Sequence, residues 1–490
     1  MKMKTKSKLL IAILTLATIM GFFTFAIGTD SEVIYLDPSG DITGEIDTLH
    51  LLISSDEGPD VILFNGNIVT MEETEPLVEA IAIKDELIFA VGNNSDILDL
   101  AEKNTSLIDL QGKTVVPGFI DAHSHWIGDR GLTDLTEFND IMETLVSSGW
   151  TSISELFVNQ YRLNELNATD SANELRVRVN AYLPLSYGYD QRFGDWYQAY
   201  QPGYEFSSFL RIAGVKLFMD RWYETETLFF NHSELQELMQ DAHDLGFQIA
   251  IHSVTTNATD VVLDSFEAVL GTEWNNQRHR IEHLVLLRDD QINRMANLGM
   301  YACVQFPWFN SDWIESEETH IPNTSQVCRW RDLLDAGVHV MGSTDFPYTG
   351  YGAMTPIQCI SMAVTRIGID GVAPPEYMSN QAITPEEALR LLTIDAAYGS
   401  FQEDVKGSIK VGKYADLVVL SQNPLTVPEQ NINDTQILMT IIGGKEEYKV
   451  DNFYSDESLI SGYPLMMISI SMGIIIIIKK SRLKKKKIEK

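Results

Sequence analysis

Cysteine is scarce in this chain of 490 residues, which contains only three. Cys303, Cys328 and Cys359 are scattered, and the sequence has no Cys-x-x-Cys motif. A disulfide framework requires several cysteines at close spacing, usually in even number. We therefore exclude a small domain held together by disulfides. The 44% of apolar residues is enough for a large core instead.

Positive charge is also scarce. The chain has 36 lysines and arginines against 69 aspartates and glutamates, which gives a formal net charge of −33. Both ends are basic, so the part between them is more acidic still. Such a body repels the phosphates of nucleic acid, and we exclude nucleic acid as a partner. A solvated or salt-adapted surface explains the acidity more simply than a specific cation-binding role.

Long apolar runs are confined to the two ends of the sequence. Four lysines precede an uncharged run over 9–28, so residues 1–28 are predicted to be a signal peptide or an N-terminal anchor. The run over 459–478 is long enough for a transmembrane helix, and the basic tail 479–490 is typical of a cytoplasmic flank. A core helix is the alternative, but core helices rarely end in a cluster of lysines.

These two ends predict a protein of the cell membrane. We expect the main body to face outside, the C-terminal helix to contact the membrane and the tail to be cytoplasmic. Seven Asn-x-Ser/Thr sequons lie between the two apolar runs, which agrees with an exported body.

Short β-strand patterns occur on both sides of the central part of the chain. An acidic linker over 29–58 leads into residues 59–114, which contain runs such as "VILFNGNIVTM" with Asn-Gly as a turn signal. A similar passage, "GKYADLVVL", occurs within residues 401–450. We expect these N- and C-terminal flanks to pair into one small β-sandwich.

Residues 115–400 alternate between apolar strands and helical patterns. Gly246, Gly299 and Gly337 stand where helix C-caps belong, directly before a strand. This order is typical of α/β proteins, and eight strands in roughly 250 residues predict a (β/α)8 TIM barrel. The strand candidates are 115–121, 150–156, 176–184, 212–218, 247–252, 279–284, 300–306 and 338–344.

Metal-binding side chains occur at the ends of these strands, where a barrel places its catalytic residues. One such residue is weak evidence, because a single histidine in an apolar run is more often part of the core. Several together on one face indicate a site for Zn²⁺ or a similar ion, since imidazole and carboxylate are its usual ligands. The residues are His123, His125, Lys216, His252, His283 and Asp345.

Lys216 lies inside the apolar run "IAGVKLF". Burial disfavours an ammonium group and would leave a neutral amine, which can add CO₂ to form a carbamate. That anion could bridge two metal ions. The alternative is a snorkelling or salt-bridged lysine, with Asp220 as its partner.

Five motifs together resemble the amidohydrolase superfamily of metal-dependent hydrolases. They are "VVPGFIDAHSHW", "GVKLFMD", "RHRIEH", "GSTDFP" and "TPEEALRLLTIDAAYGSF", which is followed by "KGSIKVGKYADLVVLSQNP". Within the superfamily they are most similar to the subgroup that contains N-substituted formamide deformylases. The resemblance covers about residues 59–427, with the motifs in the order that the family has them.

The resemblance implies a barrel with a β-sandwich built from both flanks, and one or two divalent metal ions, with Zn²⁺ as the expected ion. It implies one ion on His123, His125 and Asp345, a second on His252 and His283, and a carboxylated Lys216 between them. The implied activity is hydrolysis of a non-peptide C–N bond, amide or formamide-like, in a small molecule.

Roles can be assigned within this set. Asp345 would be both ligand and catalytic base. Glu282 would orient an imidazole ligand by hydrogen-bonding it without binding the metal itself. Aromatic side chains in the loops suggest a pocket for an apolar or ring-bearing substrate, although packing against the rim of the barrel is an equal alternative. The substrate candidates are Trp308, Arg221 and Tyr187.

Two other functions stay open from the sequence. A deaminase of cyclic amidine substrates would use the same ligands and would release ammonia. A non-catalytic surface binding protein on the same fold would be expected to have lost part of the ligand set, which this chain retains.

Overall fold

The computed structural model describes residues 26–29, 32–35, 58–186, 191–221, 227–308, 324–348, 352–368, 370–373 and 375–454. The chain divides into two compact units, residues 1–57 and 58–490. In the first, β1 (Ala26–Thr29) and β2 (Glu32–Tyr35) form an antiparallel hairpin. The second unit contains the other elements.

The predicted membrane segments stay predictions. The span over 459–478, the tail and all but the last three residues of 1–28 lie outside the described residues. Within the described part of the chain, no helix combines the length and the apolar character needed to cross a membrane.

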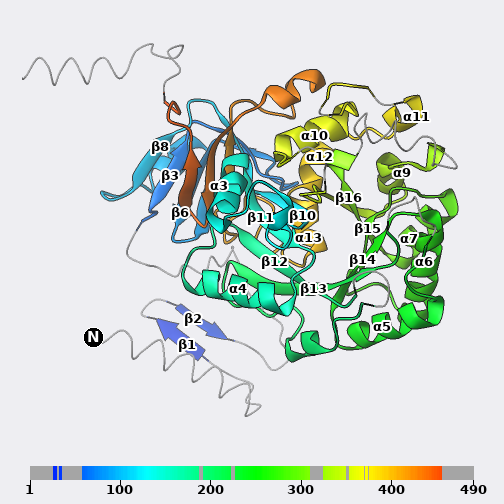
Figure 1. Ribbon diagram of the computed structural model, residues 1–490. Coiled ribbons are helices and arrows are strands. Elements are labelled where there is room, and N and C mark those ends of the chain that lie inside the picture. The colour runs from blue at the N-terminus through cyan, green and yellow to red at the C-terminus, as the bar shows by residue number, and fades with distance from the viewer. Residues whose placement is uncertain are drawn as a thin grey trace, which may run out of the picture. The chain divides into compact units, whose positions relative to one another are not determined.

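Eight parallel strands form a nearly closed barrel, as the alternating pattern predicted (Figure 1). Each strand pairs with its neighbours in sequence order, and two hydrogen bonds join the first strand to the segment after the last. They run from Asp345 N to His123 O and from His125 N to Phe346 O, each 2.8 Å long. The strands are β10 (Phe119–Ser124), β11 (Trp150–Glu155), β12 (Arg178–Pro184), β13 (Leu210–Phe218), β14 (Gln248–Ser253), β15 (Arg280–His283), β16 (Tyr301–Gln305) and β17 (His339–Ser343).

Helices surround the barrel and cover its apolar outer face (Figure 1). The predicted glycines end helices as expected, with positive φ at Gly246, Gly299 and Gly337. Thr384 caps the helix that begins at Pro385, also as predicted. The helices are α3 (Phe138–Ser148), α4 (Gln160–Ser171), α5 (His232–Asp244), α6 (Thr256–Leu270), α7 (Asp289–Leu298), α9 (Trp330–Asp335), α10 (Pro356–Thr365), α11 (Glu376–Ser379), α12 (Pro385–Leu391) and α13 (Ile394–Gly399).

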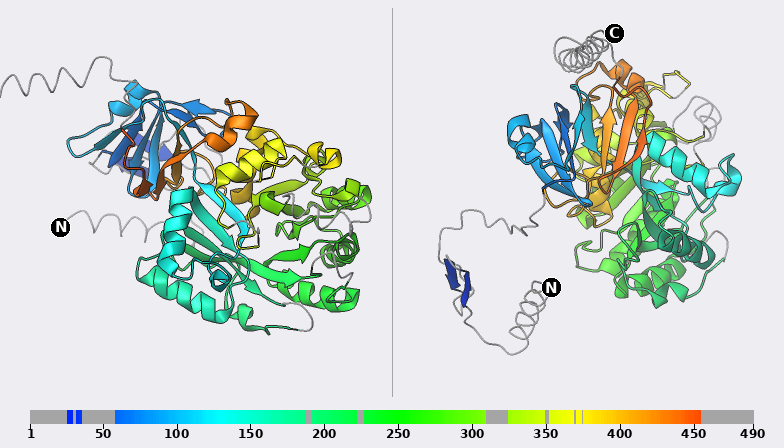
Figure 2. Two further views of the ribbon diagram at one scale, coloured as in Figure 1. Left: turned by 45° about the horizontal axis from the view of Figure 1, so that its top comes forward. Right: turned by 90° about the vertical axis from the view of Figure 1, so that its left-hand side faces the viewer.

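The two flanks meet in a pair of sheets that share one apolar core (Figure 2). Antiparallel pairing of β18 (Leu417–Leu420) with β9 (Thr114–Pro117) joins the C-terminal flank to the N-terminal one, with Leu417 opposite Pro117. The larger sheet has the order β20-β19-β18-β9-β4-β5, and the smaller one β7-β6-β3-β8. The strands are β3 (Val61–Phe64), β4 (Asn67–Val69), β5 (Leu77–Val78), β6 (Ala80–Lys84), β7 (Leu87–Gly92), β8 (Ser106–Asp109), β9 (Thr114–Pro117), β18 (Leu417–Leu420), β19 (Ile437–Ile442) and β20 (Lys445–Lys449). A short helix, α2 (Asn94–Leu98), packs on β3 and β6.

The first predicted barrel strand, 115–121, is divided between the two parts of the fold. Residues up to Pro117 belong to the sandwich, and the barrel strand begins at Phe119. Gly118 lies between them, where a Cβ would come within 2.2 Å of Thr151 Oγ1. The chain crosses here at a distance that only glycine permits, so the boundary falls at residue 118.

Candidate metal centre

The paired histidines lie beside the aspartate predicted to share their metal ion. Asp345 Oδ1 is 3.2 Å from His123 Nε2 and 3.5 Å from His125 Nε2. All three side chains are buried, and one possible ligand atom of each lies within 4.8 Å of the others. Strands β10 and β17 are neighbours across the closure of the barrel, which brings together residues more than two hundred positions apart.

The other two histidines lie against this group. The ring of His283 is 4.8 Å from that of His123 and 4.3 Å from that of His252, measured between centroids. His283 ends β15 with a φ of 77°, and Asp345 has a φ of 57°. Glu282 points into the barrel, so its neighbour in a regular strand would point outward. The left-handed backbone at His283 instead lets both side chains face the site.

Lys216 Nζ is fully buried and makes no hydrogen bond to any part of the chain that the structure describes. The amine lies 4.7 Å from the centroid of the Phe218 ring. Burial lowers the pKa of Lys216 to about 8, although Glu282 and Asp345 oppose the shift. The salt bridge to Asp220 that we considered does not form. Asp220 instead accepts hydrogen bonds from Val254 N and from Thr255 N and Oγ1.

Hydrogen bonds on the far side of the rings select which imidazole nitrogen faces the centre. Glu282 Oε2 lies 2.6 Å from His123 Nδ1, and the carbonyl of Arg221 lies 2.8 Å from His252 Nε2. Both oxygens accept, so each ring donates there and keeps a lone pair on its other nitrogen. Glu282 therefore lies where a residue that orients an imidazole should lie.

The same reasoning extends to the remaining two rings. Gln305 Oε1 lies 2.8 Å from His283 Nδ1. His125 Nδ1 makes no hydrogen bond to the described residues, and its nearest carboxylate oxygen, Asp129 Oδ2, is 3.5 Å away. Three of the four imidazoles thus have a fixed orientation.

Electrostatics keep the four rings neutral. Burial lowers the pKa of His125 and of His252 to about 3, and Lys216 adds to both shifts. The same two causes, in the same order, hold the pKa of His123 well below its ordinary range. Burial, followed by His252, His123 and Lys216, does the same to the pKa of His283. Burial raises the pKa of Asp345 well above that of an ordinary aspartate. Neutral imidazoles are the form that ligates a metal ion.

A second cluster of possible ligands, formed by His123, Glu282 and Cys303, is also buried. Arg280 contacts this cluster through Glu282. Its Nε and Nη2 donate to the two oxygens of Glu282 at 2.5 and 2.8 Å. Burial acts to raise the pKa of Glu282, but Arg280 and Lys216 outweigh it and leave the pKa lowered. A metal ion would compete with this guanidinium for Glu282. The cluster therefore holds the ring of His123 in place and is not a second metal site.

Two buried carboxylates hold the loops that carry the ligands. Asp121 accepts hydrogen bonds from Thr344 N and Oγ1 at 2.9 and 2.6 Å, directly before Asp345. Glu155 accepts from the backbone N–H groups of Ile127 and Gly128, in the loop after His125. Burial raises the pKa of Asp121 to about 6 and that of Glu155 to about 8.

Among the residues that the structure describes, only one of the three predicted substrate residues has its side chain against a predicted ligand. Trp308 stacks on His283 with 4.6 Å between ring centroids and 8° between planes. Arg221 has an exposed side chain and contacts His252 through its backbone carbonyl. Tyr187 lies outside the described residues. Tyr348 was not among the predicted substrate residues, and its ring meets that of His125 edge-on with 5.5 Å between centroids.

The sequence did not single out Gln305, Asp129 or Arg280. Gln305 ends the seventh strand, so a search for polar residues at strand ends would have found it. Arg280 lies at the other end of the sixth strand, where that search would have missed it. Asp129 is four residues beyond His125 in a loop, and no local pattern marks it.

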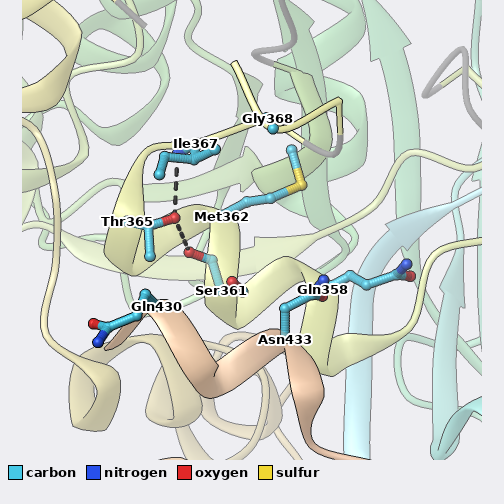
Figure 3. A pocket seen from close by; sticks show the side chains of 9 residues that line it. Gln358, Ser361, Met362, Thr365, Ile367, Gly368, Gln430 and Asn433 are labelled. Atoms are coloured by element: carbon cyan, nitrogen blue, oxygen red, sulfur yellow. Dashed lines mark hydrogen bonds between the residues drawn. The ribbon is translucent and has the colours of Figure 1, made fainter. Parts of the chain in front are cut away.

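A cavity of about 190 Å³ lies away from the metal centre, between α10 and the 3₁₀ helix Glu429–Asp434 (Figure 3). Gln358, Ser361, Thr365, Gln430 and Asn433 are its polar lining residues. None of the residues lining this cavity ionises, and none is a predicted ligand, so the cavity does not contribute to the site.

Comparison with known proteins gives one family and several relatives. Residues 133–448 match the model of the amidohydrolase family, a range that includes Lys216, His252, His283 and Asp345 and begins after the paired histidines. An N-substituted formamide deformylase of Arthrobacter pascens is 32% identical over 264 residues. That match covers 50% of this chain and 47% of the deformylase, so the chain spans about half the length of this relative.

Two further matches extend over most of the chain. An imidazolonepropionase of Fusobacterium nucleatum is 23% identical over 414 residues, which cover 74% of this chain and 92% of that protein. The crystal structure of a metal-dependent hydrolase from Pyrococcus horikoshii superposes with a TM-score of 0.64 at 22% identity. It covers 75% of this chain and 99% of the hydrolase, which establishes the shared fold.

Proposed function

Because the chain belongs to the amidohydrolase family, we propose that it is a metal-dependent hydrolase that cleaves a non-peptide C–N bond, amide or formamide-like, in a small molecule. The observation that carries this proposal is the convergence of four neutral imidazoles, one aspartate and one buried lysine at the end of the barrel. The names of the deformylase and imidazolonepropionase relatives support a C–N bond as the target.

The residues fit one or two divalent metal ions. His123 Nε2 and Lys216 Nζ are buried and make no hydrogen bond to the described residues, and the donor set of imidazole and carboxylate suits Zn²⁺. His123, His125 and Asp345 would hold one ion, and His252 and His283 a second. When bound, such ions acidify water and polarise the bond to be cleaved.

Lys216 is the residue that would join the two positions. Its lowered pKa supplies neutral amine near neutral pH. The amine nitrogen would add to CO₂ and release one proton, which leaves a carbamate with a single negative charge. This step changes the charge at the end of the side chain from neutral, in the free amine, to negative.

Asp345 is the proposed catalytic base. Its carboxyl is buried, and its raised pKa suits a group that accepts a proton from water and then gives it to the leaving nitrogen. Glu282 holds the ring of His123 and is a positioning residue. Trp308 and Tyr348 place aromatic rings against two of the ligands, and we propose an apolar or ring-bearing substituent on the substrate.

We further propose that the apolar segment over 459–478 tethers the protein to the cell membrane, with the body outside and the basic tail in the cytoplasm. The apolar run and its lysine cluster support this arrangement. A protease added to intact cells should degrade the body and leave the tail. Protection of the body would refute the proposed orientation.

The proposed activity is tested by metal analysis of the purified full chain together with hydrolysis of N-formyl and N-acyl amines. We expect bound divalent metal, and a fall in turnover of at least about 100-fold in Asp345→Asn. Asp264→Asn, an exposed aspartate paired with Arg294, is the matched control and should keep full turnover. Ammonia release from cyclic amidines would favour a deaminase. A folded, metal-free and inactive protein would favour a binding protein.

A further inference from the structure

Gln305 and His283 lie at the ends of neighbouring strands and are joined by one buried hydrogen bond. His283 ends β15 and Gln305 ends the adjacent β16. Gln305 is 2% exposed and His283 is 4% exposed. His283 Nδ1 and Gln305 Oε1 are 2.8 Å apart. The question is which of the two side chains donates, because the answer fixes the tautomer of a predicted metal ligand.

The surroundings of Gln305 allow only one orientation of its amide. The other end of the amide lies 3.3 Å from the carbonyl oxygen of Cys303 and 3.1 Å from Ser343 Oγ. A carbonyl only accepts, so the atom facing Cys303 must be the NH₂ group. Ser343 Oγ donates its single hydrogen to the carbonyl of Val304 at 3.0 Å. Toward Gln305 the hydroxyl can therefore only accept.

The direction of every bond in this group follows. With its NH₂ turned toward Cys303 and Ser343, Gln305 presents its carbonyl oxygen to the ring of His283. The ring must therefore carry its proton on Nδ1 and its lone pair on Nε2. We propose that Gln305 is a positioning residue that sets the tautomer of His283, so that Nε2 is available to a divalent metal ion.

The assignment of Nε2 as a ligand rests on the proposed function, whereas the tautomer does not. The ring also has little freedom to turn. Trp308 stacks on it at 4.6 Å, and His252 lies 4.3 Å from it between centroids. Stacking fixes the plane of the ring, and the bond to Gln305 fixes which edge of that plane faces inward.

An amide differs here from the carboxylate that serves His123. Arg280 neutralises Glu282 through two hydrogen bonds. Gln305 makes its hydrogen bonds to neutral groups among the described residues: a ring nitrogen, a hydroxyl and a carbonyl. A neutral acceptor selects the tautomer without adding a second buried charge. Gln305→Glu would keep an acceptor at this position, whereas Gln305→Met keeps the size of the side chain and removes the acceptor.

Metal affinity tests the proposal without any assay of turnover. Zn²⁺ affinity of the full chain is measured by competition with a chromophoric chelator, and the Co²⁺ form is followed by its absorption spectrum. We expect Gln305→Met to weaken one Zn²⁺ site about 10- to 100-fold and to change the Co²⁺ spectrum. Gln305→Glu should stay within about threefold of the wild type.

Gln248→Met is the matched control. Gln248 is also buried, at the start of β14, and hydrogen-bonds Tyr182, Arg278 and Gly399 rather than a ligand. It should lower stability and leave Zn²⁺ affinity unchanged. Wild-type affinity in Gln305→Met would overturn the proposal, as would equal losses in Gln305→Met and Gln305→Glu.

Nitrogen NMR of the metal-free protein tests the tautomer directly. Histidine ¹⁵N shifts distinguish a protonated from an unprotonated ring nitrogen, and the signals of His283 are those lost in His283→Gln. We expect a proton on Nδ1 in the wild type and a mixture of tautomers in Gln305→Met. A proton on Nε2 in the wild type refutes the role of Gln305. A wild type that binds no metal refutes the proposed function while this measurement still decides on Gln305.

Discussion

The buried ring of His279 predicts how the stability of the fold depends on pH, independently of the metal centre. The ring is buried directly before β15, next to His243 on α5. Ile249 N donates to His279 Nδ1 at 3.0 Å, and His279 Nε2 lies 2.9 Å from His243 Nδ1. Since Nδ1 accepts, Nε2 carries the proton and donates to His243. A second proton on His279 would have to displace the bond from Ile249.

The cost of that second proton gives the magnitude. Burial, with a further contribution from His243, lowers the pKa of His279 from 6.5 to about 3. The unfolded chain therefore binds a proton at this residue below about pH 6.5, whereas the folded chain does not. Its stabilising contribution is complete above pH 6.5 and is lost as the pH falls toward 3. Between pH 8 and pH 5 the loss is about 2 kcal/mol.

The assay is urea denaturation of metal-free protein at several pH values from 8 to 5. His279→Gln should be less stable than the wild type at pH 8, and its free energy of unfolding should fall by about 2 kcal/mol less over this range. His232→Gln, at an exposed histidine paired with Asp264, should follow the wild-type curve. Parallel curves for His279→Gln and the wild type would refute the argument.

Two further substitutions separate stability from function. Lys216→Met should abolish hydrolysis and yet stabilise the metal-free fold by about 1–3 kcal/mol, because it removes a buried amine without a hydrogen bond to the described residues; a lower melting temperature than the wild type would contradict this. Asp416→Ala should cost about 3–5 kcal/mol in urea denaturation, because Arg178 would remain buried without the carboxylate that both its Nε and Nη2 contact; a loss below about 1 kcal/mol would show that the pair is not needed.

Local signals in the sequence were enough to predict the barrel. The helix C-caps at Gly246 and Gly299 and the N-cap at Thr384 depend on a few adjacent residues, and each is found as expected. The positions of the predicted ligands at strand ends follow from the same signals. Once the strands are parallel and in sequence order, their ends meet at one rim, and residues as distant as His123 and Asp345 become neighbours.

Features that depend on tertiary contacts were not predictable. The boundary at Gly118 depends on the approach of Thr151 from another strand. The left-handed backbone at His283 contradicts simple alternation and is fixed only by the packed site. Gln305 acquires its role because β15 and β16 pair, and a lone glutamine in "VQF" does not indicate a partner.

The balance of charge in the interior bears on how many metal ions the site can hold. Glu282 is neutralised by Arg280. Among the predicted ligands, only Asp345 and Lys216 carry a charge that does not depend on protonation of a ring, one of each sign. A single divalent ion on His123, His125 and Asp345 leaves Lys216 free to lose its proton. A second ion adds two positive charges to a buried site with no further carboxylate among its predicted ligands, which is unfavourable unless Lys216 becomes an anion.

Carbamate formation on Lys216 supplies that anion, so the second ion and CO₂ should bind together. We expect about one Zn²⁺ per chain in CO₂-depleted buffer and about two after bicarbonate is added, as measured by elemental analysis after removal of unbound metal. Lys216→Met should hold at most one ion in either buffer, since it cannot form the carbamate. Two ions per chain in CO₂-depleted buffer, or in Lys216→Met, would show that the lysine does not control occupancy and that another anion balances the charge.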